Sequence, residues 1–337
     1  MAMNQPPLHQ LFQLQAKKTP DAVAVVDGAR SITYEELDDL TDSLAGYLQQ
    51  QGITHDDPVG IFMDTCAEYV IAYIAILKAG GAYMPLDLAY PDSFLGRIFA
   101  EAKPKVAITK NQYAPRLSPE FGAIALSIDT DNAWRDFSYD EDAGSSITLD
   151  NLAFLAYTSG TTGEPKGVLQ THQSSVHSYL GRYEISSYKP GDRVACNIFF
   201  VWELLRPLLK GGATYVIPDD VIYDPRLLTN FIADNEITEI LFTPSLLETT
   251  LNSISPDQFR ERLSSLNTIW LNGEVVTARL KNRVLDILPD HVRLLNTYSI
   301  SESHDVSDVD LRVAEELPSK ICSVGRPRTD VVLRLLD

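Results

Sequence analysis

The chain has 337 residues, 45% of them apolar, which is enough for a sizeable core and for roughly two domains of ordinary size. Its 46 acidic residues outnumber its 28 basic ones, and the net charge of −18 argues against a surface that binds nucleic acid or anionic membrane. No run of about 18 apolar residues and no secretory signal pattern is visible, so we expect a cytoplasmic protein with no membrane partner.

The first part of the chain alternates between helical and strand patterns. Helical spacing of apolar residues at 33–52, 68–81 and 92–103 is followed each time by a short apolar strand, at 58–63, 82–87 and 105–110. This alternation predicts an α/β sheet with helices on its faces. The acidic, glycine-containing stretch 138–150 is interpreted as a connection to a second unit of the chain.

A second series of the same kind begins near residue 200. Helical patterns at 202–212, 225–237 and 278–291 precede strand patterns at 213–219, 238–244 and 292–299. The sequence therefore predicts a second α/β layer. The last segment, 323–337, alternates polar and apolar residues after a Gly-Arg-Pro turn, which predicts the start of a third element.

Between the two series lies the stretch "LAYTSGTTGEPKGVLQTH" (155–172), in which a polar loop separates a strand from a strand end and a helix start. Its glycines let the backbone approach a ligand, and its hydroxyls and one lysine are donors for phosphate oxygens. The loop is not a P-loop of the GxxxxGK[ST] kind, because Gly167 follows Lys166. From these residues alone, a phosphate-binding loop and a flexible connector both fit.

Six segments, in the same order, resemble the motifs of the adenylate-forming superfamily, and especially of the amino-acid adenylation domains of nonribosomal peptide synthetases. The polar loop is similar to the family's phosphate-binding motif, close to YTSGTTGxPKGV. The other five are ITYEEL (32–37), LKAGGAYMPLDLAYP (77–91), LNGEVVTARL (271–280), NTYSISE (296–302) and VGRPRTDVVLRLLD (324–337). The resemblance covers nearly the whole chain.

The resemblance implies the α/β fold of adenylate-forming (ANL) enzymes. We expect two stacked α/β layered subdomains, a first at 1–145 and a second at 146–316 that holds the phosphate loop and the adenine and acyl pockets. The start of a small β-barrel subdomain is expected at 317–337. The family pattern continues beyond the position of Asp337 into a C-terminal subdomain with a catalytic lysine, so we expect an adenylation core without that subdomain, from an isolated or an interrupted domain.

The implied chemistry is ATP-dependent activation of an acid. A carboxylate oxygen attacks the α-phosphorus, pyrophosphate leaves and an acyl-adenylate remains, a reaction that depends mainly on positioning and charge neutralisation. By resemblance, Glu302 binds magnesium and Ser301 lies beside the α-phosphate; with Lys166 and Thr158 they are the expected catalytic residues. The β- and γ-phosphates are assigned to the polar loop: Thr158, Ser159, Gly160, Thr161, Thr162, Gly163 and Lys166.

Further residues of these motifs are expected at the adenine and acyl pockets. Tyr298 matches the family's adenine-stacking aromatic residue, although core packing is the alternative for a tyrosine at a strand end, and Asn296 opens the same motif. Gly273 and Glu274 match the segment near adenine. The expected substrate pocket comprises Ile198, Asn272, Gly273, Ser299, Ile300, His304 and Asp305.

One departure from the family concerns the substrate amine. The family's FDxS segment carries an aspartate that pairs with the α-ammonium of an amino acid, whereas the shorter run "ACNIFF" (195–200) puts Ile198 at that place. Burying an ammonium against isoleucine would remove its solvation without a counter-charge. Three readings stay open: the acid lacks a free α-amine, as an α-keto, α-hydroxy or aryl acid does; another acidic residue supplies the pairing; or residues are missing from the sequence.

His304 and Asp305 are unusual for the family and are candidate substitute pocket residues, although His304 also fits a solvated loop. The expected function is activation of a carboxylic acid with ATP and Mg²⁺ for loading onto the phosphopantetheine of a carrier domain, beside other synthetase domains. The alternatives are ordinary amino-acid adenylation in a rearranged pocket, a stand-alone acyl-CoA or aryl-acid ligase, and a degenerate core that acts as a binding or scaffolding module.

Overall fold

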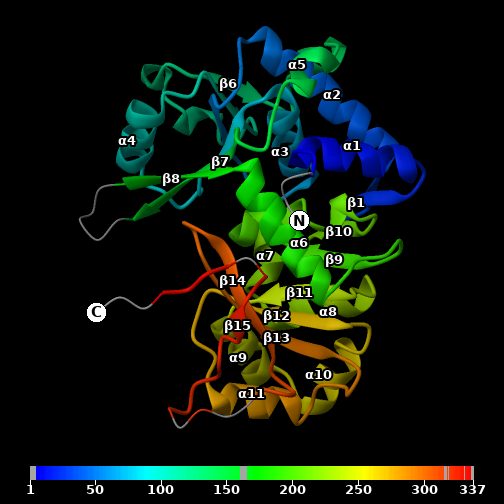
Figure 1. Ribbon diagram of the computed structural model, residues 1–337. Coiled ribbons are helices and arrows are strands. Elements are labelled where there is room, and N and C mark those ends of the chain that lie inside the picture. The colour runs from blue at the N-terminus through cyan, green and yellow to red at the C-terminus, as the bar shows by residue number, and fades with distance from the viewer. Residues whose placement is uncertain (1–4, 160–164, 315–316, 318, 330, 335–337) are drawn as a thin grey trace.

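The computed structural model describes residues 5–159, 165–314, 317, 319–329 and 331–334 (Figure 1). Its strands form two sheets, one of six strands and one of nine strands. The α/β architecture with two layered sheets confirms the fold class expected from the alternating pattern.

The six-stranded sheet has the order β6-β5-β3-β4-β7-β8. Its strands are parallel except β8, which runs antiparallel to β7. The strands are β3 (Pro58–Phe62), β4 (Ala82–Pro85), β5 (Val106–Thr109), β6 (Ile124–Ser127), β7 (Leu152–Ser159) and β8 (Pro165–Thr171).

The nine-stranded sheet has the order β15-β14-β13-β12-β11-β9-β10-β1-β2. Its central strands are parallel, whereas β2, β14 and β15 are antiparallel to their neighbours. The strands are β1 (Val23–Asp27), β2 (Arg30–Thr33), β9 (Arg193–Cys196), β10 (Ala213–Val216), β11 (Glu239–Phe242), β12 (Thr268–Leu271), β13 (Arg293–Ile300), β14 (His304–Asp310) and β15 (Arg326–Pro327). In Figure 1, β6, β7 and β8 of the six-stranded sheet lie in the upper part of the view, while the nine-stranded sheet runs from β1 and β10 near the middle down to β12 and β13.

Helices connect the parallel strands and cover the sheets. They are α1 (Leu8–Lys18), α2 (Tyr34–Gln50), α3 (Ala67–Ala79), α4 (Asp92–Ala102), α5 (Glu141–Ser145), α6 (His172–Ile185), α7 (Asp219–Ile222), α8 (Pro225–Asp234), α9 (Pro244–Ser253), α10 (Pro256–Arg262) and α11 (Ala278–Leu285). Local sequence sets several of their ends: Thr33 and Glu36 form a capping box at the start of α2, and Gly80 ends α3 with a φ of 91°.

The sheets exchange segments across the boundary expected at residue 145. β1 and β2 precede that residue but belong to the nine-stranded sheet, while β7 and β8 follow it and complete the six-stranded sheet. The expected boundary therefore does not coincide with a change of sheet. The segment expected to begin a barrel at 317 adds the edge strand β15 to the nine-stranded sheet, and the described residues contain no closed barrel.

The helix expected at 202–212 is replaced by two 3₁₀ helices, η5 (Ile198–Leu204) and η6 (Pro207–Leu209). Pro207 lacks the backbone N–H that an α-helix needs in its interior, and its ring clashes with the preceding turn. The expected strand before the polar loop, and the strand end and helix start after it, are confirmed as β7, β8 and α6. Helix α6 lies between the two sheets in Figure 1, and its side chains reach both.

Candidate functional site

The polar loop joins the antiparallel strands β7 and β8. Thr158 pairs with Lys166 and Ser159 with Pro165, so the hairpin holds the two ends of the loop next to each other. Lys166 is exposed. The expected phosphate-binding residues Gly160, Thr161, Thr162 and Gly163 lie outside the described residues, as do the side chains of Thr158 and Ser159.

A second hairpin, β13 and β14, carries the expected magnesium and α-phosphate residues. Glu302 lies in its turn with an exposed side chain, and Ser301 precedes it. Gln170 on β8 donates from Nε2 to the backbone oxygen of Ser301 over 2.7 Å, and Ser174 on α6 donates to Oε1 of Gln170 over 2.6 Å. This chain of hydrogen bonds joins the strand that leaves the polar loop to the hairpin that carries Glu302.

A cavity of about 260 Å³ lies where the two hairpins meet, and we call it the aromatic pocket. It contains seven of the residues expected at the reacting groups: Asn272, Gly273, Ser299, Ile300, Ser301, His304 and Asp305. Its other lining residues are Phe154, Ala156 and Trp202. Motif matching missed Phe154 and Trp202 because neither stands in the functional part of a motif. Trp202 was used only as a reference point for aligning the shortened run 195–200 with the family.

Asp305 is held in a buried cluster of charges. Arg182 on α6 donates to both carboxylate oxygens over 2.9 and 3.3 Å, Arg328 lies 3.2 Å away, and Ser178 donates over 3.1 Å. Burial by itself would raise the pKa of Asp305, but the charges of Arg182 and Arg328 outweigh it and hold that pKa well below its usual range. Asp305 is therefore an ionised carboxylate whose two oxygens already have partners.

His304 is buried, with 7% of its surface exposed, and is not a solvated loop histidine. Its Nε2 lies 3.2 Å from Oγ of Ser175. Burial lowers the pKa of His304 to about 4, so its imidazole is neutral at pH 7. The ring is packed against Phe154 and Trp202 in the wall of the aromatic pocket.

The residues expected near adenine have different surroundings. Asn296 is buried on β13 and donates from Nδ2 to the backbone oxygen of Ser323 over 2.9 Å. Tyr298 is 41% exposed, which excludes the core-packing alternative. Gly273, with a φ of 87°, lines the aromatic pocket, whereas Glu274 accepts hydrogen bonds from the N–H and hydroxyl of Ser245.

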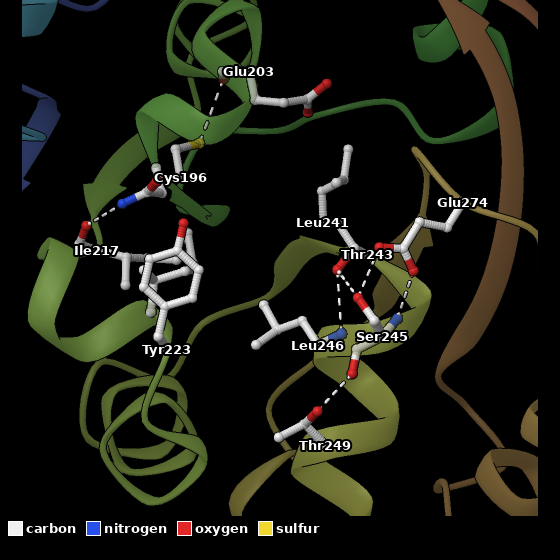
Figure 2. Close-up of a pocket in the computed structure, with 13 residues that line it drawn as sticks. Cys196, Glu203, Ile217, Tyr223, Leu241, Thr243, Ser245, Leu246, Thr249 and Glu274 are labelled. Carbon is white, nitrogen blue, oxygen red and sulfur yellow. Dashed lines mark hydrogen bonds between the residues drawn. The ribbon is translucent and has the colours of Figure 1, made fainter. Parts of the chain in front are cut away.

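Glu274 and Ser245 stand at the rim of a second cavity of about 360 Å³, shown in Figure 2. This cavity lies beyond the carboxyl ends of parallel strands β9, β10, β11 and β12, where ligands bind in open α/β sheets. Its walls are mostly apolar, with Ile217, Ile222, Leu241 and Leu246 among them, while the side chains of Thr243, Ser245 and Glu274 gather at one end (Figure 2). The two neighbouring residues Gly273 and Glu274 thus serve different cavities.

A third cleft of about 550 Å³ borders both of these cavities. It shares Ala156, Trp202 and Ser301 with the aromatic pocket, and Asn197 and Tyr223 with the cavity of Figure 2. Asn197 donates to Thr65 and Asp219, each over 3.0 Å, which ties a loop of the six-stranded sheet to the nine-stranded one. Ile198 begins η5 directly after Asn197, but its side chain lies outside the described part of the chain.

Within the described ranges, no group of three or more His, Cys, Asp or Glu side chains is arranged to hold a metal ion. Among the residues that the structure describes, Glu302 is thus a single candidate ligand and not one of a cluster. None of the described helices combines the length and apolar character that crossing a bilayer requires.

Residues 12–337 match the family of AMP-binding enzymes. Glycine betaine reductase ATRR from Emericella nidulans is 40% identical over 324 residues, which are 94% of this chain and 25% of that protein. Tyrocidine synthase 3 from Brevibacillus parabrevis is 31% identical over 98% of this chain and 5% of its own length. The chain thus spans a quarter or less of the length of these curated relatives.

Solved structures of nonribosomal peptide synthetases share the fold. FmoA3 in its α-methyl-L-serine-AMP bound form superposes with a TM-score of 0.84 at 25% identity, over 97% of this chain and 37% of that one. The four-domain synthetase AB3403, bound to AMP and glycine, gives a TM-score of 0.80 at 25% identity, over 97% of this chain and 23% of that one. This chain belongs to the AMP-binding enzyme family.

Proposed function

We propose that the chain activates a small carboxylic acid with MgATP, releases pyrophosphate and forms an acyl-adenylate that passes to the phosphopantetheine thiol of a carrier domain. The hydrogen bond from Gln170 to the backbone of Ser301 carries this proposal. It joins β8, the strand that leaves the polar loop, to the hairpin that carries Ser301 and Glu302. Transfer at phosphorus depends mainly on positioning and charge neutralisation, so the residues that bind the phosphates and the metal ion have to lie close together.

In this proposal the polar loop, Thr158 to Lys166, holds the β- and γ-phosphates, and Ser301 donates a hydrogen bond at the α-phosphate. The carboxylate of the acid lies in the aromatic pocket, where one of its oxygens attacks the α-phosphorus in line with the leaving pyrophosphate. Tyr298 would stack on the adenine, and Gly273 would lie near it. The ammonium charge of Lys166 balances the charge that grows on pyrophosphate as it leaves.

Magnesium fits the residues present. A small cation that keeps several waters and binds phosphate oxygens needs only one or two protein carboxylates, and Glu302 offers one that is exposed beside Ser301. Bound there, the ion would neutralise charge on the phosphate oxygens.

The substrate we propose is an acid whose nitrogen, if it has one, carries no N–H. Of the described residues that line the aromatic pocket, Asp305 is the sole carboxylate, and both of its oxygens have partners. Among these described residues, a primary ammonium would therefore find no carboxylate that is free to balance its charge. The relative from Emericella nidulans is named for glycine betaine, whose nitrogen bears three methyl groups and no hydrogen. Glycine betaine is the first acid we would supply.

The test is acid-dependent ATP–pyrophosphate exchange by the full-length protein. The panel contains glycine, sarcosine, dimethylglycine and glycine betaine, together with α-keto, α-hydroxy and aryl acids. We expect exchange to rise along the methylation series and to be weakest with glycine. Exchange confined to acids with a free amine would overturn the proposed substrate, and an absence of exchange with every acid would favour a binding module over an enzyme.

Two variants tie the exchange to the proposed residues. Lys166→Ala and Glu302→Ala should each lower exchange by on the order of 100-fold, and Glu302→Ala should also weaken Mg²⁺-dependent binding of ATP. Glu261→Ala, at an exposed position on α10, is the control and should leave both unchanged. Equal activity of Glu302→Ala and Glu261→Ala would remove Glu302 from the mechanism.

A further inference from the structure

Three aromatic rings from distant parts of the chain meet at the aromatic pocket. The centroids of Phe154 on β7 and His304 on β14 are 5.1 Å apart, and the two ring planes are inclined by 80°. Trp202 in η5 lies 6.5 Å from His304 with an angle of 86°. His304 thus stands nearly perpendicular to both neighbours, and all three rings line one cavity of about 260 Å³.

The position of His304 carries a conformational cost. Its φ of 59° lies in the left-handed region, which a residue with a side chain occupies at a cost of order 1 kcal/mol or more. The pairing of β13 with β14 is irregular between Tyr298 and Ser299, just before the turn. The contact with Ser175 and the burial of the ring hold His304 in this conformation. An extended residue here would send its side chain in another direction.

The other residues that line the pocket limit the kind of group that it can bind. Asp305 is engaged by Arg182 and Arg328, and the hydroxyl of Ser299 is directed to the amide oxygen of Asn272. Three aromatic rings thus line this cavity, and the one carboxylate among its described lining residues is already engaged. Faces of aromatic rings attract cations through their quadrupole, and several rings together form the cages that recognise quaternary ammonium ions.

We propose that Phe154, Trp202 and His304 form an aromatic cage that binds a quaternary ammonium group of the acid, and that His304 determines this specificity. The proposal rests on the proposed function, because it names how the same pocket selects the acid. The cage places the trimethylammonium group between the rings and leaves the carboxylate near Ser301, where activation takes place. Binding of the ammonium group therefore requires an aromatic ring at position 304, and an apolar side chain there would not be enough.

The experiment compares two acids of the same shape. Glycine betaine and 3,3-dimethylbutyrate both carry a trimethyl head next to a methylene carboxylate, but only the first head is charged. Exchange kinetics give kcat and KM for each acid with the full-length protein. We expect kcat/KM to favour glycine betaine by at least about tenfold, since aromatic rings that line the pocket attract a desolvated cation but not the neutral head of 3,3-dimethylbutyrate.

The decisive variant is His304→Asn. Asparagine tolerates the left-handed backbone and keeps a polar group for Ser175, but it removes the ring. The KM for glycine betaine should rise about tenfold or more, while the KM values for 3,3-dimethylbutyrate and ATP stay within about twofold. Trp202→Phe, which keeps a ring, should retain the preference, and Trp202→Leu should reduce it. A merely structural role of His304 would change the KM of both acids together.

The outcomes separate this inference from the function on which it rests. If both acids are activated equally well, or if His304→Asn leaves their ratio unchanged, the cage is overturned while acid activation stands. If neither acid supports exchange but another acid does, the cage and the proposed substrate both fail. Calorimetric titration of the protein with glycine betaine and a non-hydrolysable ATP analogue reads binding without turnover, and no heat of binding would likewise overturn the cage.

Discussion

Arg182 on α6 and Asp305 on β14 form an ion pair, with Nε 2.9 Å from Oδ2, and neither side chain has significant contact with water. The guanidinium of Arg182 also lies 4.2 Å from the ring centroid of Trp270. The pair joins the helix between the two sheets to the hairpin that carries the candidate metal ligand. It therefore supports the site and the packing of the sheets at once.

Removing one charge of this pair should destabilise the protein. Asp305→Asn removes the nearest counter-charge of the buried Arg182 and, among the described residues, leaves it only Glu203, 3.5 Å away, so we expect the free energy of unfolding to fall by about 3–5 kcal/mol. Glu248→Gln breaks the exposed pair with Arg279 and should cost less than about 1 kcal/mol. Urea unfolding of the two variants measures the difference. Equal and small effects would show that the Arg182–Asp305 pair does not support the fold.

Gln170 should act as a positioning residue for the reaction. Gln170→Leu keeps most of the side-chain volume but removes the hydrogen bond to the backbone of Ser301. We expect about a tenfold fall in kcat for exchange, because the hairpin of Ser301 is then no longer aligned with the polar loop. Gln173→Leu, at an exposed position on α6, should keep the parent rate. A fall in stability without a fall in kcat would assign Gln170 a structural role only.

Two glycines inside helices should respond in opposite ways to alanine. A Cβ at Gly46 in α2 would overlap the backbone carbonyl of Ser138, whereas at Gly96 in α4 it would approach Phe121 no closer than 3.4 Å. Gly46→Ala should therefore lower the unfolding free energy by about 1–3 kcal/mol, and Gly96→Ala should raise it by up to about 1 kcal/mol. Thermal denaturation tests both, and a gain in stability for Gly46→Ala would contradict the close approach of Ser138.

Stability should fall in mild acid because of a buried histidine. His172 accepts a hydrogen bond at Nδ1 from the N–H of Leu8, lies 5.7 Å from His9, and is fully buried. Burial lowers the pKa of His172 to about 3, and the nearby His9 contributes in the same direction. The unfolded chain, with an ordinary histidine pKa near 6.5, binds a proton that the folded chain does not. The contribution to stability is thus complete above about pH 6.5 and is lost as the pH falls toward 3.

The measurement is urea unfolding of His172→Asn at pH 7.5 and pH 5. Over this interval the variant should lose about 2 kcal/mol less stability than the parent protein. Asparagine retains an acceptor for the N–H of Leu8, and His291→Asn at an exposed position is the control. An unchanged pH dependence in His172→Asn would mean that His172 does not titrate on unfolding.

Much of the fold follows from local patterns. Periodic apolar residues, capping residues and glycines predicted the alternation of helices and strands, and β7, β8 and α6 form where the sequence around Lys166 predicted two strands and a helix. The exception at 202–212 also has a local cause in Pro207, which the helical spacing of its neighbours obscured. Membership of β1 and β2 in the distant sheet was not predictable, since strand pairing over this sequence separation depends on the whole packing.

The order of the motifs can be read from the residues alone, and it indicates the family and the residues expected at the phosphates, the metal and the acid. The sequence left open whether His304 is solvated and whether Asp305 is free to pair with an amine. Only the tertiary structure decided both points, because Arg182 lies 123 residues from Asp305, and Phe154 and Trp202 come from other elements to enclose His304. The ionisation and accessibility of a side chain depend on the charges and surfaces brought around it, and these are set by packing between segments that no local pattern connects.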